Sequence, residues 1–443
     1  MVAEVIMNYF DLLRLRTEQF PEKPFIIYSG EIYTYRVFYN KCLQLVAGIE
    51  ESGGRVVLVY SDDFMFQFAA FFALQAIHAV PILLHCPLPE EKIKILAQVF
   101  GINDLLTEGS LRELDVIKIP PPQDACMGLL TSGTMGLSKL FYRTYASWAC
   151  FFPVHNEIFC ITAESLMLLH GSLSFTGNLN AALALLYAGG TLVTAKGFHP
   201  KQFERCIEDF NITHIYLIPA KLHALADAMQ HEHLGVLQVL SGSQLLNPAT
   251  VRKLQEKNLP NSAIHLYYGA AELSFLSYVG AQEILENPLR VGKPFPGVRI
   301  FTVGEDLHVD TPYHVIGYPR PCSLPDRAYF DEEGHLVLQG RRDKLHNIRG
   351  FKVSESHVER VLRAIHGVSD AAVFLEKDKN LDTKLVAAVV SELDEATIRS
   401  ELSKKIYRLE IPRKIILCDS IPLNHAGKPD YSALQAMFAQ KPS

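Results

Sequence analysis

The sequence Gly-Leu-Leu-Thr-Ser-Gly-Thr-Met-Gly-Leu-Ser-Lys occupies residues 128–139 of this 443-residue chain. Its apolar start is typical of a buried strand, and a turn rich in glycine and hydroxyl side chains follows. Gly133 and Gly136 allow backbone N–H groups to approach an anion, and Lys139 adds a positive charge. Further hydroxyl donors come from Thr131, Ser132 and Thr134. We predict a phosphate-binding loop; the alternative is an ordinary Ser/Thr/Gly turn.

Two common phosphate motifs are excluded. Residues 133–139 lack the Gly-Lys-Ser/Thr ending of the Walker pattern, and no strand–Gly-x-Gly-x-x-Gly–helix unit for a dinucleotide is found. The loop therefore matches neither of these two motifs.

The segments on both sides of the loop predict an α/β fold. Before it, strand-like runs at 55–60 and 80–84 flank an apolar helix at 64–77. After it, strands at 166–169 and 191–195 flank a helix at 178–188, and the alternation continues to about residue 267. Such alternation is typical of parallel sheets covered by helices, so we expect two layered α/β subdomains.

The character of the chain changes towards its C-terminal end. Short β segments at 298–303, 313–318 and 335–339 predict a β-rich subdomain. Beyond it, helices at 355–365 and 395–407 alternate with short strands, as in a small α+β domain. We predict a large N-terminal domain over 1–341 and a small C-terminal domain over 344–443, with the boundary between Arg341 and Lys344.

Composition restricts the class of protein. The net charge is -6 and 49% of residues are hydrophobic, which describes an ordinary globular protein without a basic field for nucleic acid. Eight cysteines without C-x-x-C spacing predict reduced, mostly buried thiols in a cytoplasmic protein. The N-terminus predicts no signal peptide, and polar residues interrupt the most apolar segment, 64–84, so we expect no transmembrane helix.

Three further parts of the sequence could carry chemistry: residues 268–272, Asp326 with Arg341, and the loop 422–428. Tyr268 could stack on a base, and Glu272 could hold Mg²⁺ against phosphate oxygens. A carboxylate such as Asp326 together with Arg341 could hold ribose hydroxyls through charge-assisted hydrogen bonds. Lys428 lies in the glycine-containing loop 422–428. Each has an ordinary alternative: a core tyrosine, a solvated acid or an exposed surface lysine.

These motifs occur together in the order and with roughly the spacing of the adenylate-forming superfamily, which the chain resembles over nearly its whole length. That superfamily contains acyl-CoA synthetases, aryl-acid adenylating enzymes and the adenylation domains of peptide synthetases. The stretch Gly30–Tyr35 resembles the family's early hairpin, and 69–81 its next helix and strand.

The resemblance implies roles for particular residues. Catalysis would fall to Lys428, Glu272 and Thr134, with Glu272 binding Mg²⁺, and Asp343 would be the hinge. ATP, and CoA near Gly350, would be bound by Thr131, Ser132, Gly133, Thr134, Gly136, Lys139, Gly242, Ser243, Gln244, Tyr268, Gly269, Ala270, Asp326, Arg341 and Gly350. The acid pocket would contain Ser174, Phe175, Thr176 and Leu179.

Several positions depart from the family pattern. Met135 replaces a hydroxyl residue of the phosphate loop and Ser138 a proline, which predicts a weaker grip on phosphate rather than its loss. Thr176 stands where peptide-synthetase domains carry an aspartate that pairs with the ammonium of an α-amino acid. A buried ammonium without such a partner would cost several kcal/mol. An aryl or aliphatic carboxylic acid is therefore the expected substrate.

The resemblance thus implies an ATP-dependent acid–thiol ligase. It would form an acyl-adenylate with release of pyrophosphate and then transfer the acyl group to CoA. One alternative acceptor is the phosphopantetheine of a carrier protein. A further alternative is a nucleotide-binding homologue without catalytic activity.

Overall fold

The computed structural model describes residues 8–49, 54–84, 89–102, 104–131, 139–304, 306–341, 345–348, 351–377, 383–408, 410–424 and 428–440. For Arg341 it describes the backbone alone. Eight residues singled out above lie outside the described residues: Ser132, Gly133, Thr134, Met135, Gly136, Ser138, Asp343 and Gly350.

A six-stranded sheet in the order β6-β5-β3-β4-β7-β8 forms the first layer. Its central strands are parallel, and β7 and β8 form an antiparallel pair. The side chain of Asp63 accepts a hydrogen bond from the Phe66 N–H at 2.6 Å and thereby caps the buried helix α3. The strands of this six-stranded sheet are β3 Val56–Tyr60, β4 Val80–Leu84, β5 Asp104–Leu106, β6 Leu111–Glu113, β7 Met127–Thr131 and β8 Lys139–Arg143. The helices of this part of the chain are α2 Tyr35–Ala47, α3 Phe64–Ala76 and α4 Glu90–Phe100.

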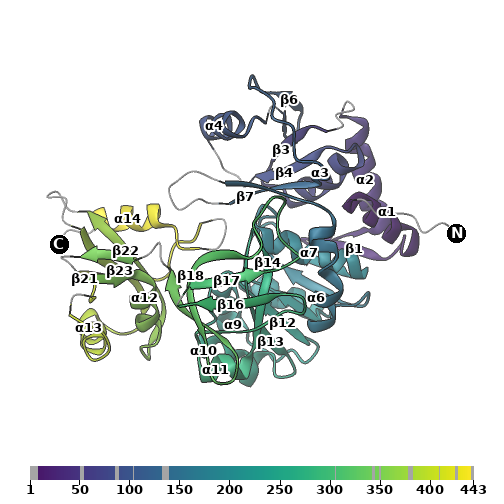
Figure 1. The fold of residues 1–443 in the computed structure, drawn as a ribbon. Coiled ribbons are helices and arrows are strands. Elements are labelled where there is room, and N and C mark those ends of the chain that lie inside the picture. The colour runs from purple at the N-terminus through teal and green to yellow at the C-terminus, as the bar shows by residue number, and fades with distance from the viewer. Residues whose placement is uncertain are drawn as a thin grey trace.

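A 13-stranded sheet, in the order β16-β17-β18-β19-β15-β14-β13-β12-β11-β9-β10-β1-β2, forms the body of the molecule. Its strands are β1 Pro24–Tyr28, β2 Glu31–Thr34, β9 Leu166–Leu169, β10 Thr191–Thr194, β11 His214–Tyr216, β12 Gln238–Ser241, β13 Ala263–Ala270, β14 Ser274–Gly280, β15 Arg290–Pro294, β16 Arg299–Val303, β17 Asp306–Asp310, β18 Cys322–Phe330 and β19 Leu336–Arg341. The predicted second α/β subdomain and the β-rich subdomain are therefore parts of one continuous sheet (Figure 1).

The helices of this body are α1 Tyr9–Gln19, α5 Ala146–Ala149, α6 Phe152–Ile158, α7 Thr176–Ala188, α8 Pro200–Asp209, α9 Pro219–Ala228, α10 Pro248–Lys253 with a π-helical turn at Leu254–Asn258, and α11 Ala281–Glu286. Strand order reverses beside β9: the chain passes from β9 to β10 on one side and then returns to β11 on the other. In open α/β sheets, ligands bind in the crevice outside the carboxyl ends of the strands at such a reversal.

The C-terminal part lies to one side of the body, next to β18 (Figure 1). It contains a three-stranded sheet, β22-β23-β24, and the separate pair β20-β21. Its elements are β20 Leu345–Ile348, β21 Phe351–Ser354, α12 Glu355–Arg363, β22 Val368–Lys377, β23 Thr383–Ser391, α13 Glu395–Ser403, β24 Lys414–Leu417 and α14 Tyr431–Gln440. Apolar residues on each face of the sheet form clusters of their own, so the small α+β unit has its own core.

Three local predictions are wrong. Residues 313–318 form turns instead of a strand, although the Val315 and Ile316 N–H groups donate to the Glu272 and Tyr142 carbonyls. Strand β13 continues past Tyr267 to Ala270 because β14 pairs with it. Three of the seven described cysteines are buried and two are exposed, so the thiols are not mostly buried, although all seven are free.

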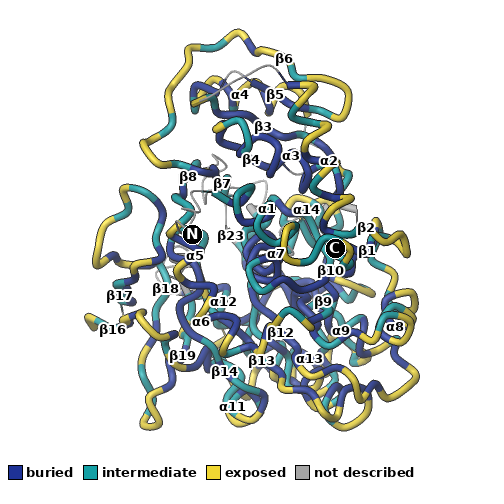
Figure 2. Tube along the Cα trace, turned by 90° about the vertical axis from the view of Figure 1, so that its right-hand side faces the viewer, coloured by how far each residue is buried: buried dark blue, intermediate teal, exposed yellow. Residues whose placement is uncertain are grey.

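Buried residues follow the strands and the helices packed on them, whereas exposed residues lie on the outer turns and around β6 (Figure 2). Within the described ranges, no helix is both long and apolar enough to cross a membrane.

Candidate functional site

The predicted adenine and ribose residues lie in direct contact. The Tyr268 hydroxyl donates a hydrogen bond to Oδ2 of Asp326 at 2.9 Å, across 58 residues of sequence. In the pairing of β18 with β19, Asp326 lies directly opposite Arg341. Strands β13, β18 and β19 therefore bring one aromatic ring, one carboxylate and one arginine backbone position together.

The turn after β12 approaches the same strand. Gly242 is buried, and a Cβ built there would lie 2.2 Å from the Tyr267 ring, so only glycine fits. Ser243 adopts a left-handed backbone conformation with φ of 76°. Its buried Oγ is among the side-chain atoms that find no hydrogen-bond partner in the described structure. A strained residue with an unsatisfied hydroxyl, beside Gln244, is typical of a ligand site.

A β-bulge shapes the end of β13. The register shifts between Tyr268 and Gly269, so that Tyr268 pairs with Ser277 and Gly269 with Phe275. A Cβ on Gly269 would lie 2.5 Å from the Ser274 carbonyl oxygen, so this position also excludes larger residues. Bulges redirect side chains next to functional sites, and this one leads directly into the turn that carries Glu272.

The ends of the predicted phosphate loop are placed by the β7–β8 pair. Thr131 is the last residue of β7, and its partner in the register is Lys139, the first residue of β8. The ammonium-bearing Lys139 is exposed and Thr131 is half-buried. The two strands thus hold Thr131 and Lys139, the residues on either side of 132–138, opposite each other.

Arg143, which the sequence analysis missed, connects the strand after this loop to the Glu272 turn. Its guanidinium is fully buried and donates through Nη2 to the Ala271 carbonyl at 2.7 Å and through Nη1 to the Tyr313 carbonyl at 2.8 Å. It also lies over the Trp148 ring. Burial lowers the pKa of Arg143 to about 10, and the negative charge of Glu272 is one of the groups that oppose this shift.

The Glu272 turn has the chemistry expected of a Mg²⁺ site. Glu272 is half-buried, and its backbone is fixed by the hydrogen bond that its carbonyl accepts from Val315 at 2.8 Å. Among the described residues, no group of three His, Cys, Asp or Glu side chains could hold a metal. Mg²⁺ is commonly bound by one or two carboxylates with phosphate oxygens and water as its other ligands, so a single glutamate fits.

The predicted acid-pocket residues follow β9 at the point where strand order reverses. Ser174 Oγ lies 2.8 Å from Ser172 Oγ, and Thr176 is the first residue of α7. A cavity of about 10 Å³, the space of about one water molecule, lies between this segment and the strand before the phosphate loop. Its lining consists of Phe71, Pro81, Leu83, Gly128, Leu129, Leu130, Leu173, Ser174 and Leu179.

Two tyrosines that the sequence analysis did not assign to the site lie beneath the start of α7. Tyr216 ends β11, and its hydroxyl is hydrogen-bonded to that of Tyr267 in β13. A Cβ built on Gly177, next to Thr176, would lie 2.5 Å from the Tyr216 hydroxyl and 2.7 Å from the Tyr267 hydroxyl. The two phenols therefore lie directly beside the first turn of α7.

Lys428 lies in the loop between β24 and α14 of the C-terminal part. Its backbone N–H donates to Oδ1 of Asn424 at 3.1 Å, and its carbonyl accepts from the Asn424 N–H at 2.7 Å. The residue is exposed. The two hydrogen bonds thus join Asn424 and Lys428, the residues on either side of 425–427.

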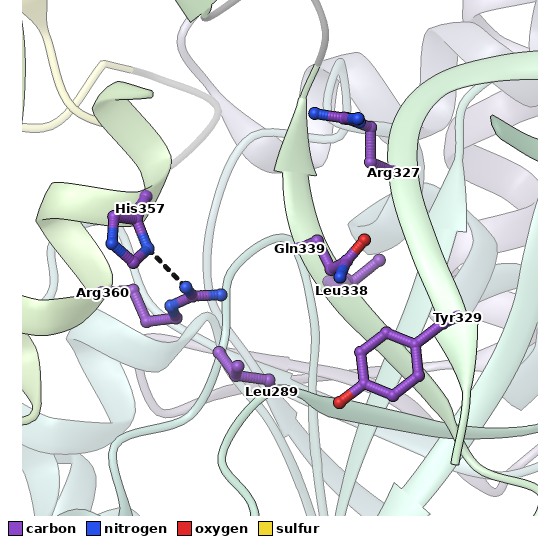
Figure 3. A pocket seen from close by; sticks show the side chains of 7 residues that line it. All are labelled: Leu289, Arg327, Tyr329, Leu338, Gln339, His357 and Arg360. Atoms are coloured by element: carbon purple, nitrogen blue, oxygen red, sulfur yellow. Dashed lines mark hydrogen bonds between the residues drawn. The ribbon is translucent and has the colours of Figure 1, made fainter. Parts of the chain in front are cut away.

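A groove of about 510 Å³ separates β18 and β19 from helix α12 (Figure 3). Arg327, the neighbour of Asp326, lines it from β18, and His357 and Arg360 line it from α12. Burial lowers the pKa of Arg360, which donates a hydrogen bond to Nδ1 of His357. The groove lies between the body and the C-terminal part and contains none of the predicted site residues.

Comparison with known proteins gives two family matches. Residues 102–318 match the AMP-binding enzyme family, and residues 357–428 match the AMP-binding enzyme C-terminal domain. The chain is 28% identical to the uncharacterized acyl–CoA ligase YhfT of Bacillus subtilis, over 70% of this chain and 68% of that protein. It is 24% identical to VraA of Staphylococcus aureus, a candidate long-chain fatty acid–CoA ligase, over 96% and 97% of the two chains.

Solved structures share the fold. The o-succinylbenzoate CoA synthetase MenE from Bacillus subtilis, in complex with an acyl-adenylate intermediate, aligns with a TM-score of 0.81 at 18% identity, over 96% of this chain and 97% of MenE. Klebsiella oxytoca NpsA, in complex with 3-hydroxyanthranilyl-AMSN, aligns with a TM-score of 0.79 at 20% identity, over 98% of this chain and all of that one.

Proposed function

Because the chain belongs to the adenylate-forming (AMP-binding) enzyme superfamily, we propose that it is an ATP-dependent acid–thiol ligase. It would join an aryl or aliphatic carboxylic acid to AMP with release of pyrophosphate. It would then transfer the acyl group to the thiol of CoA.

The contact between Tyr268 and Asp326 is the main support for the proposal that the protein binds ATP. A ring that can stack on adenine and a carboxylate that can accept ribose hydroxyls are joined by a 2.9 Å hydrogen bond. The buried, unsatisfied Ser243 hydroxyl and the glycine at 242 lie on the neighbouring strand end. These features support a flat base and a sugar bound across the ends of β12 and β13.

The reaction requires positive charge where two anions meet. A carboxylate must attack the α-phosphate, and two unit charges 4 Å apart repel by about 1 to 4 kcal/mol in a watery to surface-like dielectric. We propose that Lys428 neutralises part of this charge and that the loop closed by Thr131 and Lys139, with Thr134, holds the departing pyrophosphate. Glu272 would hold Mg²⁺, which when bound stabilises negative charge on the phosphate oxygens.

Arg143 would act as a positioning residue for this metal ligand. Its two hydrogen bonds fix the carbonyls of Ala271 and Tyr313 on either side of the Glu272 turn. Removing the guanidinium would leave both acceptors buried and unsatisfied, which displaces the turn.

The second half-reaction requires space for a thiol near the acyl-adenylate. We propose that the units 1–341 and 344–443 are domains, that rotation at Asp343 removes Lys428 after adenylation, and that Gly350 then lies beside the path of the thiol. This order of events is what the family resemblance implies for these positions.

The acid is proposed to carry no α-ammonium. Thr176, at the first position of α7, provides a hydroxyl where an α-amino acid would require a carboxylate. The cavity beside it is lined mainly by apolar side chains. An aryl or aliphatic acid fits this surface.

ATP–pyrophosphate exchange across a panel of carboxylic acids tests the first half-reaction. Exchange that depends on one class of acid supports the proposal. ATP binding without exchange for any acid would instead identify a nucleotide-binding homologue without catalytic activity. Incubation of the active acid with CoA, and separately with a phosphopantetheinylated carrier protein, then identifies the thiol acceptor.

A further inference from the structure

The paired hydroxyls of Tyr216 and Tyr267 lie against Gly177, next to Thr176 of the proposed acid pocket. Tyr216 ends β11 at the reversal of strand order, and the pocket segment 172–176 follows the adjacent strand β9. Both hydroxyl oxygens lie within 2.7 Å of the place that a Cβ of Gly177 would occupy. Glycine at 177 is therefore what allows two phenols to reach the pocket residues.

The rings are held in place from several sides. Tyr267 stacks on Phe275 with the ring centroids 3.9 Å apart and an interplanar angle of 13°. Gly242 also lies close to the Tyr267 ring, since a Cβ built at Gly242 would lie 2.2 Å from that ring. Tyr216 and Tyr267 are only 2% and 6% exposed. A long hydrocarbon chain would have to displace this packed pair in order to extend further inwards.

The pair has one hydrogen-bond donor too many. Burial raises the pKa of both Tyr216 and Tyr267 far above neutral pH, so both phenols keep their protons. Only one of the two O–H groups can donate in the hydrogen bond between them. Among the described residues, no other acceptor is bonded to either hydroxyl. One buried O–H donor is thus left for a ligand, and leaving it unpaired costs about 1–3 kcal/mol.

We propose that the Tyr216–Tyr267 pair selects a compact carboxylic acid that carries an oxygen acceptor, such as a hydroxyl or keto group, at the end remote from its carboxylate. This inference rests on the proposed function and names its class of substrate. The acid's oxygen accepts the remaining phenol proton, and the rings limit the length of the acid. A site built to hydrogen-bond a substrate group rejects the analogue that lacks it, because its own polar group is then left unpaired.

Matched acids test the inference. ATP–pyrophosphate exchange would be measured with benzoate against 3- and 4-hydroxybenzoate, with hexanoate against 5-oxohexanoate, and with palmitate. In the unmodified protein, we expect kcat/KM for an oxygen-bearing acid to exceed that of its parent acid at least tenfold, and palmitate to be the poorest substrate. The double variant Tyr216→Phe/Tyr267→Phe should remove this ratio, because both rings remain while both O–H donors are lost.

Tyr35→Phe is the matched control. Tyr35 is also fully buried, and its hydroxyl donates to the Gly190 carbonyl at 2.8 Å. This variant should keep the ratio between paired acids, and thermal unfolding would show whether each variant folds. Equal use of paired acids, preference for palmitate, or an unchanged ratio in the double variant would overturn the inference while leaving the proposed ligase intact. Absence of exchange with every acid would instead overturn the proposed function.

Discussion

Tyr268 and Asp326 lie 58 positions apart in the sequence, and the hydroxyl of one donates to the carboxylate of the other at 2.9 Å. The bond joins the last part of β13 to the middle of β18, two strands that are separated in the sheet by β14, β15 and β19. Because neighbouring strands lie about 4.8 Å apart, the sheet must curve to bring β13 and β18 together. The bond fixes the orientation of the carboxylate that would receive the ribose.

Asp326→Ala should weaken the binding of ATP. Hydrogen bonds to charged groups contribute about 1.5–3 kcal/mol, so the KM for ATP should rise roughly tenfold or more in the exchange assay. Asp310→Ala is a suitable control, because Asp310 on neighbouring β17 pairs only with the surface arginines Arg299 and Arg320. If the KM and kcat for ATP stay unchanged in Asp326→Ala, the residue is not part of the ribose site.

Arg143→Met should affect both stability and the response to Mg²⁺. The variant leaves the Ala271 and Tyr313 carbonyls without their donor, at about 1–3 kcal/mol for each buried acceptor. We expect a lower melting temperature and a higher Mg²⁺ concentration for half-maximal exchange. Arg112→Met removes only an exposed ion pair with Glu90 and should change neither quantity much. An unaltered Mg²⁺ requirement in Arg143→Met would show that the guanidinium does not position Glu272.

Lys428→Ala should separate the two half-reactions. Loss of a cation at the reacting phosphate should slow adenylation at least a hundredfold, whereas thioester formation from a supplied acyl-adenylate should stay within a few-fold of normal. Rapid-quench measurement of each half-reaction gives the comparison. Lys404→Ala, which removes an exposed partner of Glu401, is the control on the same domain. Equal losses in both half-reactions would contradict the proposed role of Lys428.

Acid should destabilise the body of the protein through His155. Burial lowers the pKa of His155 to about 4, and its ring lies among Phe151, Phe159 and Phe275. The unfolded chain takes up this proton near pH 6.5 and the folded chain does not. The free energy of unfolding should therefore fall between pH 6.5 and 4, by on the order of 3 kcal/mol from this group.

Denaturant unfolding of His155→Phe at several pH values checks this expectation. The slope of stability against pH in that window should be smaller than in the unmodified protein. His366→Phe, which changes an exposed histidine, should leave the slope as it is. The same slope in all three proteins would show that His155 does not contribute to acid unfolding.

The sequence predicts the parts of this fold that depend on local pattern. Alternating apolar runs place β3, α3 and β4 within two residues of their observed bounds. Strand β18 is missed because Pro325 and the charged residues beside it do not resemble a strand, and only its long-range pairing with β17 and β19 makes it one. The order of the motifs predicts which residues bind the nucleotide, and these assignments stay predictions; the structure places two of them, Tyr268 and Asp326, in contact.

The rest of the site depends on contacts that no local pattern contains. Arg143 looks like a surface residue in sequence, because arginine is rarely buried without a carboxylate partner. One feature of the sequence does suggest that Arg143 is buried: it is the last residue of the strand β8, and Trp148, over whose ring it lies, follows five residues later. Tyr216 and Tyr267 are 51 residues apart and meet only because β12 places their strands on either side of itself.

Arg341, the residue that pairs with Asp326, is also the last residue of β19, and the C-terminal part follows it in the sequence. The ribose of the proposed site would therefore lie beside the residue at which β19 ends. Under the proposed function, we expect occupancy of the nucleotide site to influence the C-terminal part through this strand end, and more through the ribose than through the triphosphate.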